Sequence, residues 1–191
     1  MPRVLVPLAQ GCEELEAVTI IDLLRRAEIE VVTAGLTDGP VVASRKTVLI
    51  PDTTIDAVIN DDFDLIVLPG GLPGADHLRD DPRIIELLRR HREQGRYTAA
   101  ICAAPKVLAR AGLLEKHKAT AYPGALEPLK LDSVELSADP VVVDDKVITS
   151  RGPGTAMDFA LTLIEQLVSR QKREEVEKPL CRPDAPLVSD A

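Results

Sequence analysis

Short apolar runs alternate with longer segments of helical periodicity along most of the chain. The runs 3–9, 29–34, 64–68 and 98–101 end at turn residues and predict buried strands. The segments 12–27, 81–94, 106–111 and 155–170 repeat apolar residues at helical spacing and predict helices. Strands that alternate with helices indicate an α/β fold, with a mainly parallel sheet covered by helices on both faces.

The remaining segments add smaller elements. Residues 41–50 predict two short extended pieces around a polar turn, 118–121 a further strand, and 140–150 a hairpin turning at 144–146. Thr155 is the predicted N-cap of the last helix, with Asp158 in the capping-box position. We expect one domain over 1–178. The C-terminal tail, 179–191, contains three prolines and is expected to be irregular or loosely docked.

Composition narrows the class of protein. The 191 residues are 45% hydrophobic and 28% charged, as in an ordinary soluble globule, and the net charge of −8 makes nucleic acid an unlikely partner. The three cysteines are widely separated and form no metal-binding pattern with histidine, which favours a reducing compartment. With neither a signal-peptide core nor an apolar run of membrane-spanning length, the sequence predicts a cytoplasmic protein.

A single cysteine stands where an apolar strand gives way to a helix. Cys102 ends the run 98–101, and Pro105 suits the first turn of the helix that follows. A thiol at that corner would face unpaired N–H groups and the positive end of the helix dipole, so we expect a lowered pKa and a reactive thiolate. The alternative is that Cys102 is a small buried hydrophobe.

Glu16 heads the apolar stripe of the first helix. At about 100° per residue, Ile20, Leu23 and Ala27 fall within about 40° of it, whereas Glu14 is expected to point to water. A carboxyl on the core face would be desolvated and have a raised pKa. The alternative is a solvated acid at the helix rim. Leu15 and Val18 are apolar exceptions on the polar arc of this helix.

Two glycines follow the strand at 64–68. Gly70 and Gly71 would allow close approach to a ligand, and their N–H groups could face an anion or oxyanion. The alternative is an ordinary glycine turn. Ligands of such folds sit beyond the carboxyl ends of the strands, the edge to which 11–16, Gly70, Gly71, Cys102 and 152–154 all map. Their convergence favours a catalytic role for the cysteine, whereas His91 is expected to be structural.

Four motifs carry a family resemblance over residues 3 to about 178. The segments 11–18 (GCEELEAV), 68–71 (LPGG), 99–105 (AAICAAP) and 150–155 (SRGPGT) resemble the ThiJ/PfpI superfamily, most of all the branch of Parkinson disease protein 7 and bacterial YajL. The resemblance implies a flavodoxin-like sandwich and a homodimer. It also implies a reactive cysteine at Cys102, a protonated glutamate at Glu16, and backbone groups of Gly70, Gly71 and Ala103 near the sulfur.

The resemblance places Tyr122, Arg45, Arg151 and Pro153 in the substrate pocket or the dimer contact, with the Cys12 region and 151–154 near the subunit boundary. Two departures stand out. The protease-like branch has histidine directly after the cysteine, where this chain has Ala103, so peptidase activity is doubtful. The Parkinson-linked member has a nearby histidine where this chain has Tyr122, a poor base at neutral pH.

Two functions fit these residues. The resemblance implies a cysteine-dependent enzyme of glyoxalase or deglycase type, which acts on methylglyoxal, glyoxal or their early protein adducts and needs no metal or organic cofactor. The alternative is an oxidative-stress sensor or chaperone whose Cys102 is oxidised to the sulfinic acid, with little physiological catalysis. Cys102 and Glu16 serve both functions, so the sequence does not separate them.

Overall fold

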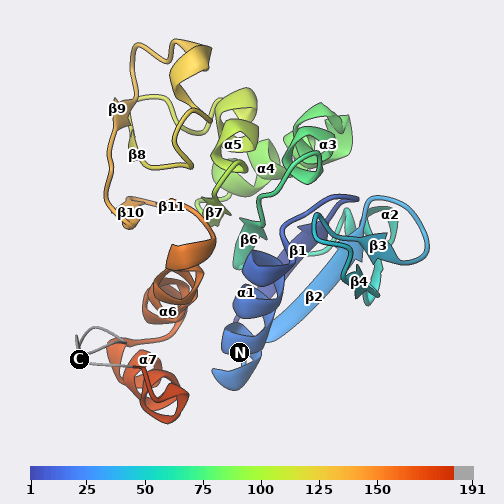
Figure 1. The fold of residues 1–191 in the computed structure, drawn as a ribbon, viewed down its shortest axis with the longest axis vertical. Coiled ribbons are helices and arrows are strands. Elements are labelled where there is room, and N and C mark those ends of the chain that lie inside the picture. The colour runs from blue at the N-terminus through green and yellow to red at the C-terminus, as the bar shows by residue number, and fades with distance from the viewer. Residues whose placement is uncertain (183–191) are drawn as a thin grey trace, which may run out of the picture.

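A seven-stranded sheet forms the centre of the structure, a computed structural model that describes residues 1–182 (Figure 1). Its strand order is β10-β11-β7-β6-β1-β2-β5, and every neighbouring pair runs parallel except β10 and β11. The strands are β1 (Arg3–Leu8), β2 (Glu30–Gly35), β5 (Thr53–Thr54), β6 (Leu65–Leu68), β7 (Tyr97–Ile101), β10 (Val141–Asp144) and β11 (Val147–Ser150).

Helices cover both faces of this sheet. Successive residues of a strand point to opposite faces, so Val4 and Val6 of β1 enter one core and Leu5 enters the other. The first core is closed by α1 (Glu14–Arg26) and α6 (Ala156–Leu167), and α7 (Arg170–Glu177) packs on α6. The second is closed by α2 (Ile55–Val58), α4 (Pro82–Glu93) and α5 (Pro105–Ala111). The predicted three-layer α/β fold is confirmed.

Smaller elements lie around the sheet. The pairs β3 (Val41–Val42) with β4 (Val48–Leu49) and β8 (Lys118–Ala119) with β9 (Glu135–Leu136) form separate two-stranded sheets. The helix α3 (Gly74–Asp80) contributes to both cores, and three 3-10 turns are η1 (Glu127–Leu129), η2 (Pro153–Thr155) and η3 (Lys178–Leu180). The hairpin predicted over 140–150 is confirmed as the antiparallel pair β10–β11.

The last predicted helix differs from the observed one. It begins at Ala156 but ends at Leu167, and a separate helix starts after Ser169. The predicted capping box is wrong: the Thr155 hydroxyl makes no cap bond to α6 and instead donates to the Gly152 carbonyl at 2.9 Å. The short helices α2 and α3 and the strand β9 were not predicted, because each is brief and lacks a full period of apolar residues.

The C-terminal part of the described residues reaches the first core through Val176 of α7 and Leu180. Within residues 1–182, none of the helices has both the length and the apolar character needed to cross a bilayer. The predicted irregular tail begins instead with η3, and the rest of that prediction, from residue 183 onward, lies outside the described residues.

His91 is buried in α4, and its Nε2 lies 2.9 Å from the Tyr97 carbonyl, as its predicted structural role requires.

The loop after β1 packs directly on the loop after β6. The Gly74 N–H donates to the Gly11 carbonyl at 3.3 Å, and the Glu13 N–H donates to the Gly70 carbonyl at 2.9 Å. A Cβ at position 74 would lie 2.5 Å from the backbone nitrogen of Cys12. The two loops therefore approach so closely that only hydrogen fits between them at this point.

Gly74→Ala is expected to lower the free energy of unfolding by about 1–3 kcal/mol, because the added methyl group would overlap the Cys12 backbone, which cannot rotate away. The measurement is the urea midpoint of each protein. Gly154→Ala is the control, since a Cβ there meets nothing within 4 Å. Equal midpoints for the two variants would contradict the close packing of these loops.

Candidate active site

Cys102 occupies a strained corner between β7 and α5. Its φ of 62° lies in the left-handed region that residues other than glycine seldom adopt. Two backbone hydrogen bonds hold this conformation: the Cys102 N–H donates to the Ser150 carbonyl at 3.0 Å, and the Tyr122 N–H donates to the Cys102 carbonyl at 2.9 Å. The side chain is 9% exposed, so a small reagent has only a narrow approach to the thiol.

Glu16 is fully buried beside this corner. Its Oε2 accepts a hydrogen bond from the Gly70 N–H at 2.8 Å, and its Oε1 makes no hydrogen bond with any residue of 1–182. Burial raises the pKa of Glu16 to about 7, against the opposing effects of the Gly70 N–H and the Cys102 thiol. A carboxyl with that pKa can both give and take a proton near neutral pH.

Glu14 differs from its expected orientation. Its carboxylate does not simply point to water but accepts hydrogen bonds from the Arg45 N–H at 2.9 Å, the Thr47 N–H at 3.3 Å and the Ser44 hydroxyl at 3.1 Å. These bonds lower the pKa of Glu14 to about 2, although its desolvation acts the other way. Glu14 thus fixes the β3–β4 turn against α1.

The predicted lowering of the Cys102 pKa is wrong in direction. Burial and the negative charge of an ionised Glu16 raise the pKa of Cys102 to about 12, while the N–H groups of Gly71 and Ala103 act in the opposite sense. The sequence argument counted the helix start but not desolvation or carboxylate repulsion. Cys102 and Glu16 therefore compete for one negative charge, and the thiolate is favoured only when Glu16 holds the proton.

The N–H groups of Gly70 and Gly71 face different side chains. The Gly70 N–H is directed to Glu16, whereas the Gly71 N–H faces the Cys102 sulfur. A Cβ at position 70 would lie 2.7 Å from the Cys102 Cβ, so any residue larger than glycine would displace the corner between β7 and α5. Gly71 has a φ of 87°, and a Cβ there would lie 2.3 Å from the Glu13 backbone nitrogen, so glycine is required at this position by the packing of the two loops.

A cavity of about 530 Å³ opens onto Cys102. Three of the four residues predicted for the pocket or the dimer contact line it: Arg45, Tyr122 and Pro153. Arg151 does not line it; its guanidinium donates to the Ala138 carbonyl at 3.0 Å, and it borders neighbouring cavities that share Tyr122.

Sequence reasoning placed 11–16, and with it Glu13, at this edge but missed several other lining residues, namely Ser44, Leu72, Lys106, Pro123, Gly124 and Ala125. Lys106 could have been found, since it stands four positions after Cys102 in the predicted first turn of the next helix. Ser44 could not, because nothing in the local pattern shows that the β3–β4 turn folds back over α1.

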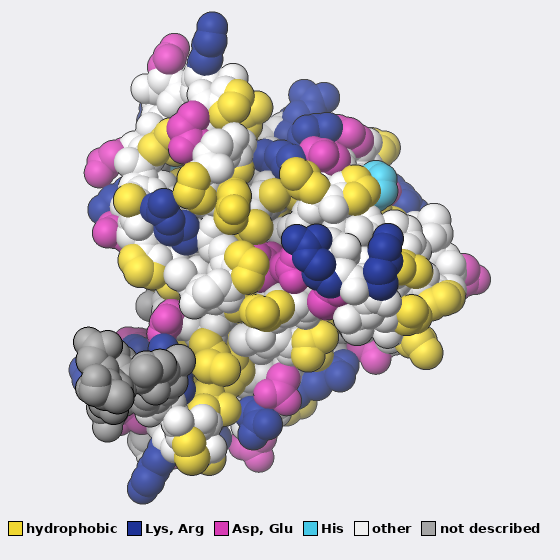
Figure 2. All heavy atoms as spheres, in the orientation of Figure 1, with side chains coloured by type: hydrophobic (Ala, Val, Ile, Leu, Met, Phe, Trp, Pro, Cys, Tyr) yellow, Lys and Arg dark blue, Asp and Glu magenta, His cyan; other side chains and the backbone are white. Residues whose placement is uncertain are grey.

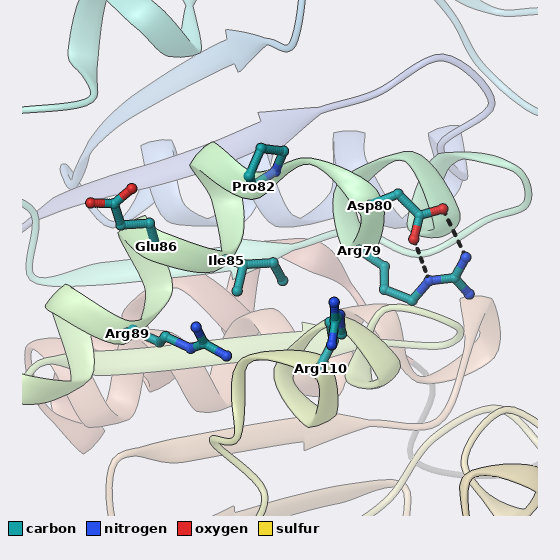
Figure 3. Close-up of a pocket in the computed structure, with 7 residues that line it drawn as sticks. All are labelled: Arg79, Asp80, Pro82, Ile85, Glu86, Arg89 and Arg110. Atoms are coloured by element: carbon teal, nitrogen blue, oxygen red, sulfur yellow. Dashed lines mark hydrogen bonds and ion pairs between the residues drawn. The ribbon is translucent and has the colours of Figure 1, made fainter.

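A larger cavity, of about 700 Å³, lies elsewhere, among α3, α4 and α5 (Figure 3). Its charged walls include Arg79, Arg89 and Arg110, and Arg79 is paired with Asp80. It is lined by no cysteine, serine or histidine, so the smaller cavity at Cys102 is the better candidate for chemistry. Over residues 1–182, no three histidine, cysteine or acidic side chains are grouped so that they could hold a metal ion.

The raised pKa of Glu16 predicts a pH-dependent stability. As pH rises from about 4.5 to 7, the unfolded chain releases the Glu16 proton first, because burial makes the folded state retain it. The free energy of unfolding of the native protein should therefore fall by about 3 kcal/mol over this window relative to Glu16→Gln, at about 1.4 kcal/mol per pH unit.

Urea unfolding at intervals from pH 4 to 8 measures this difference. Glu86→Gln is the control, because Glu86 is exposed and its stability curve should run parallel to that of the native protein. Parallel curves for the native protein and Glu16→Gln would show that Glu16 keeps an ordinary pKa in the fold.

Known proteins resemble this chain over nearly its whole length. The profile of the DJ-1/PfpI family matches residues 2–166. Protein dj-1beta of Drosophila melanogaster is 44% identical over 92% of this chain and 95% of that protein, and its crystal structure superposes with a TM-score of 0.91 over 95% of this chain and 98% of that one, at 42% identity.

One further relative is much longer than this chain, and another is named for an enzyme activity. Protein DJ-1 homolog B of Arabidopsis thaliana is 42% identical over 93% of this chain, but the match spans 40% of that longer protein. The glutathione-independent glyoxalase DJR-1.2 of Caenorhabditis elegans is 36% identical over 90% of this chain and 91% of that protein. The resemblance found from the sequence is confirmed, and the chain belongs to the DJ-1/PfpI family.

Proposed function

We propose that the chain is a cysteine-dependent enzyme of glyoxalase or deglycase type, which converts methylglyoxal, glyoxal or their early protein adducts. The observation that carries this proposal is the buried Glu16, with a pKa near neutrality, coupled to the Cys102 thiol at the base of a cavity. A glyoxalase among its relatives supports the same class. Because its cysteines are unpaired, we place the enzyme in the reducing cytoplasm.

The first step forms a carbon–sulfur bond. Cys102 transfers its proton to the Glu16 carboxylate, and the resulting thiolate adds to the aldehyde carbon of the dicarbonyl. The new alkoxide oxygen takes the proton back from Glu16, which gives a neutral hemithioacetal. The Gly71 and Ala103 N–H groups, which lower the pKa of Cys102, stabilise negative charge at this point.

The second step is an internal redox shift that needs no external oxidant. The Glu16 carboxylate removes the hydrogen of the former aldehyde carbon as a proton and returns it to the neighbouring carbon, while the hydroxyl proton passes from the first oxygen to the second. The aldehyde carbon is thereby oxidised and the ketone carbon is reduced. The product is a thioester of a 2-hydroxy acid on Cys102. Water cleaves the thioester, releasing the hydroxy acid and restoring the thiol.

Cys102→Ser and Glu16→Gln are each expected to lower methylglyoxal consumption by about a hundredfold or more, because one removes the nucleophile and the other the proton carrier. The measurement is the initial rate of methylglyoxal loss together with lactate formation. Glu86→Gln, on the exposed face of α4, should keep the native rate. Glu14 is not a suitable control, because it holds the turn that carries Arg45.

The competing proposal is a redox sensor. It is favoured by the unpartnered Oε1 of Glu16, which when protonated could donate to an oxygen of an oxidised Cys102. A native protein that leaves methylglyoxal unchanged, yet gains two oxygens on the Cys102 peptide under mild peroxide, would favour the sensor and contradict the enzyme. Turnover lost only in the Cys102 and Glu16 variants would favour the enzyme.

We also propose that two copies associate through α1 and the start of α6. Leu15 and Val18, the apolar exceptions on the polar arc of α1, are 51% and 47% exposed, and Met157 at the start of α6 is 43% exposed. Figure 2 shows hydrophobic side chains gathered over this face. Cys12, whose region is expected near the subunit boundary, is itself 1% exposed within the chain.

Light scattering at micromolar concentration should therefore give about twice the 20.7 kDa mass of the chain. Val18→Glu should shift the protein toward the monomer, because it would bury an unpaired charge in the contact. Val42→Glu is the control: Val42 is also exposed, but it lies on β3. A native protein that is monomeric would contradict this interface.

A further inference from the structure

Lys106 is an unexpected cation in the wall of the Cys102 cavity. It lies in the first turn of α5, and its side chain is 13% exposed, whereas lysine normally extends into water. Its Nζ lies 2.6 Å from Oδ1 of Asp76 in α3. Burial and this ion pair hold the ammonium group at the cavity instead of in solvent.

The partner of Lys106 is itself fixed. Oδ1 of Asp76 also accepts a hydrogen bond from Arg79 at 2.9 Å, and Arg79 in turn pairs with both carboxylate oxygens of Asp80, as the dashed lines in Figure 3 show. Asp76 thus sits at the end of a chain of charged groups along α3. An ammonium has three N–H donors, and Asp76 is the one partner that Lys106 has in residues 1–182.

A second cation lines the same cavity. Arg45 lies in the turn between β3 and β4, where its backbone N–H is held by Glu14. Its guanidinium makes no hydrogen bond or ion pair with the residues that the structure describes, and its five N–H donors are available. Arg45 and Lys106 come from segments far apart in the sequence, so their presence at one cavity reflects the fold and not a local charge cluster.

Glu13, the acidic residue in this wall, already accepts hydrogen bonds from within the chain. Glu13 caps α1, with its Oε1 3.5 Å from the Leu15 N–H, and its Oε2 accepts the Ser44 hydroxyl at 2.9 Å. The open hydrogen-bond donors of the cavity therefore include the cations Lys106 and Arg45, beside the Tyr122 hydroxyl. Such a wall suits a carboxylate, since charge-assisted hydrogen bonds from lysine and arginine are stronger than neutral ones.

We propose that the Cys102 cavity selects dicarbonyls that carry a carboxylate beyond the reacting carbonyls, and that Lys106 and Arg45 bind this group. The inference rests on the proposed dicarbonyl chemistry and names its substrate class. The reacting aldehyde lies at Cys102, and the carboxylate end contacts the two cations. The product is then a 2-hydroxy acid that bears a second carboxylate.

A matched pair of substrates tests this selection. The probes are 4,5-dioxopentanoate and 2-oxopentanal, which have the same five-carbon chain and differ only in a terminal carboxylate or methyl group. For the native protein we expect kcat/KM to favour the carboxylate probe by about tenfold or more. Lys106→Met and Arg45→Met should each reduce this ratio severalfold, mainly by raising KM for the carboxylate probe.

Two further variants separate binding from structure. Lys106→Arg keeps the charge and should keep most of the preference, and Lys46→Met, an exposed neighbour of Arg45 that does not line the cavity, should leave it unchanged. If Lys106 served only to tie α5 to α3, Lys106→Met would slow both probes equally and lower the urea midpoint.

The outcomes also distinguish this inference from the proposed function. If the native protein turns over neither probe, the dicarbonyl chemistry itself fails. If it turns over both with equal kcat/KM, or if the preference survives in both Met variants, the chemistry stands and the carboxylate selection is wrong.

Discussion

The hydrogen bond from the Gly70 N–H to the buried Glu16 carboxyl joins three parts of the fold at one point. Glu16 comes from α1, Gly70 from the end of β6, and Gly70 has no side chain because the Cys102 Cβ occupies that space. A buried carboxyl without such a partner would be costly. The contact therefore satisfies Glu16, fixes the loop after β6, and holds the carboxyl beside the Cys102 thiol.

Cys102 depends on a second set of constraints. Its positive φ is maintained by backbone bonds to Ser150 and Tyr122, which lie beyond the end of β7 in the chain but beside it in space. Strain of this kind persists only where the surroundings determine the conformation. Parallel pairing of β7 with β11 places Ser150 opposite Ile101, the residue before Cys102. The sheet topology therefore allows a cysteine to adopt this backbone conformation at the corner.

Much of the architecture could be predicted from periodicity. The buried strands β1, β6 and β7 are mostly apolar runs. The stripe that Glu16 heads predicted a core-facing acid with a solvated rim acid as the alternative, and its burial agrees with the first. The polar turn within 41–50 was predicted and is confirmed between β3 and β4, but its contact with α1 could not be predicted, because Glu14 holds it through backbone N–H groups that any sequence would offer. The break in the last helix was also missed, since the sequence through Val168 and Ser169 keeps helical composition.

The pKa of Cys102 shows that a local motif can identify the residues of a candidate site without predicting their pKa values. A helix start favours a thiolate, and the Gly71 and Ala103 N–H groups have this effect here. Desolvation and the Glu16 charge outweigh them, and both depend on packing between segments distant in sequence. Burial, however, acts on Glu16 as well, and by raising the pKa of the carboxyl it supplies a neutral neighbour for the thiolate. The same exclusion of water that makes Cys102 hard to ionise therefore keeps the Glu16 carboxyl protonated up to about pH 7, where it can exchange its proton with a neighbouring group.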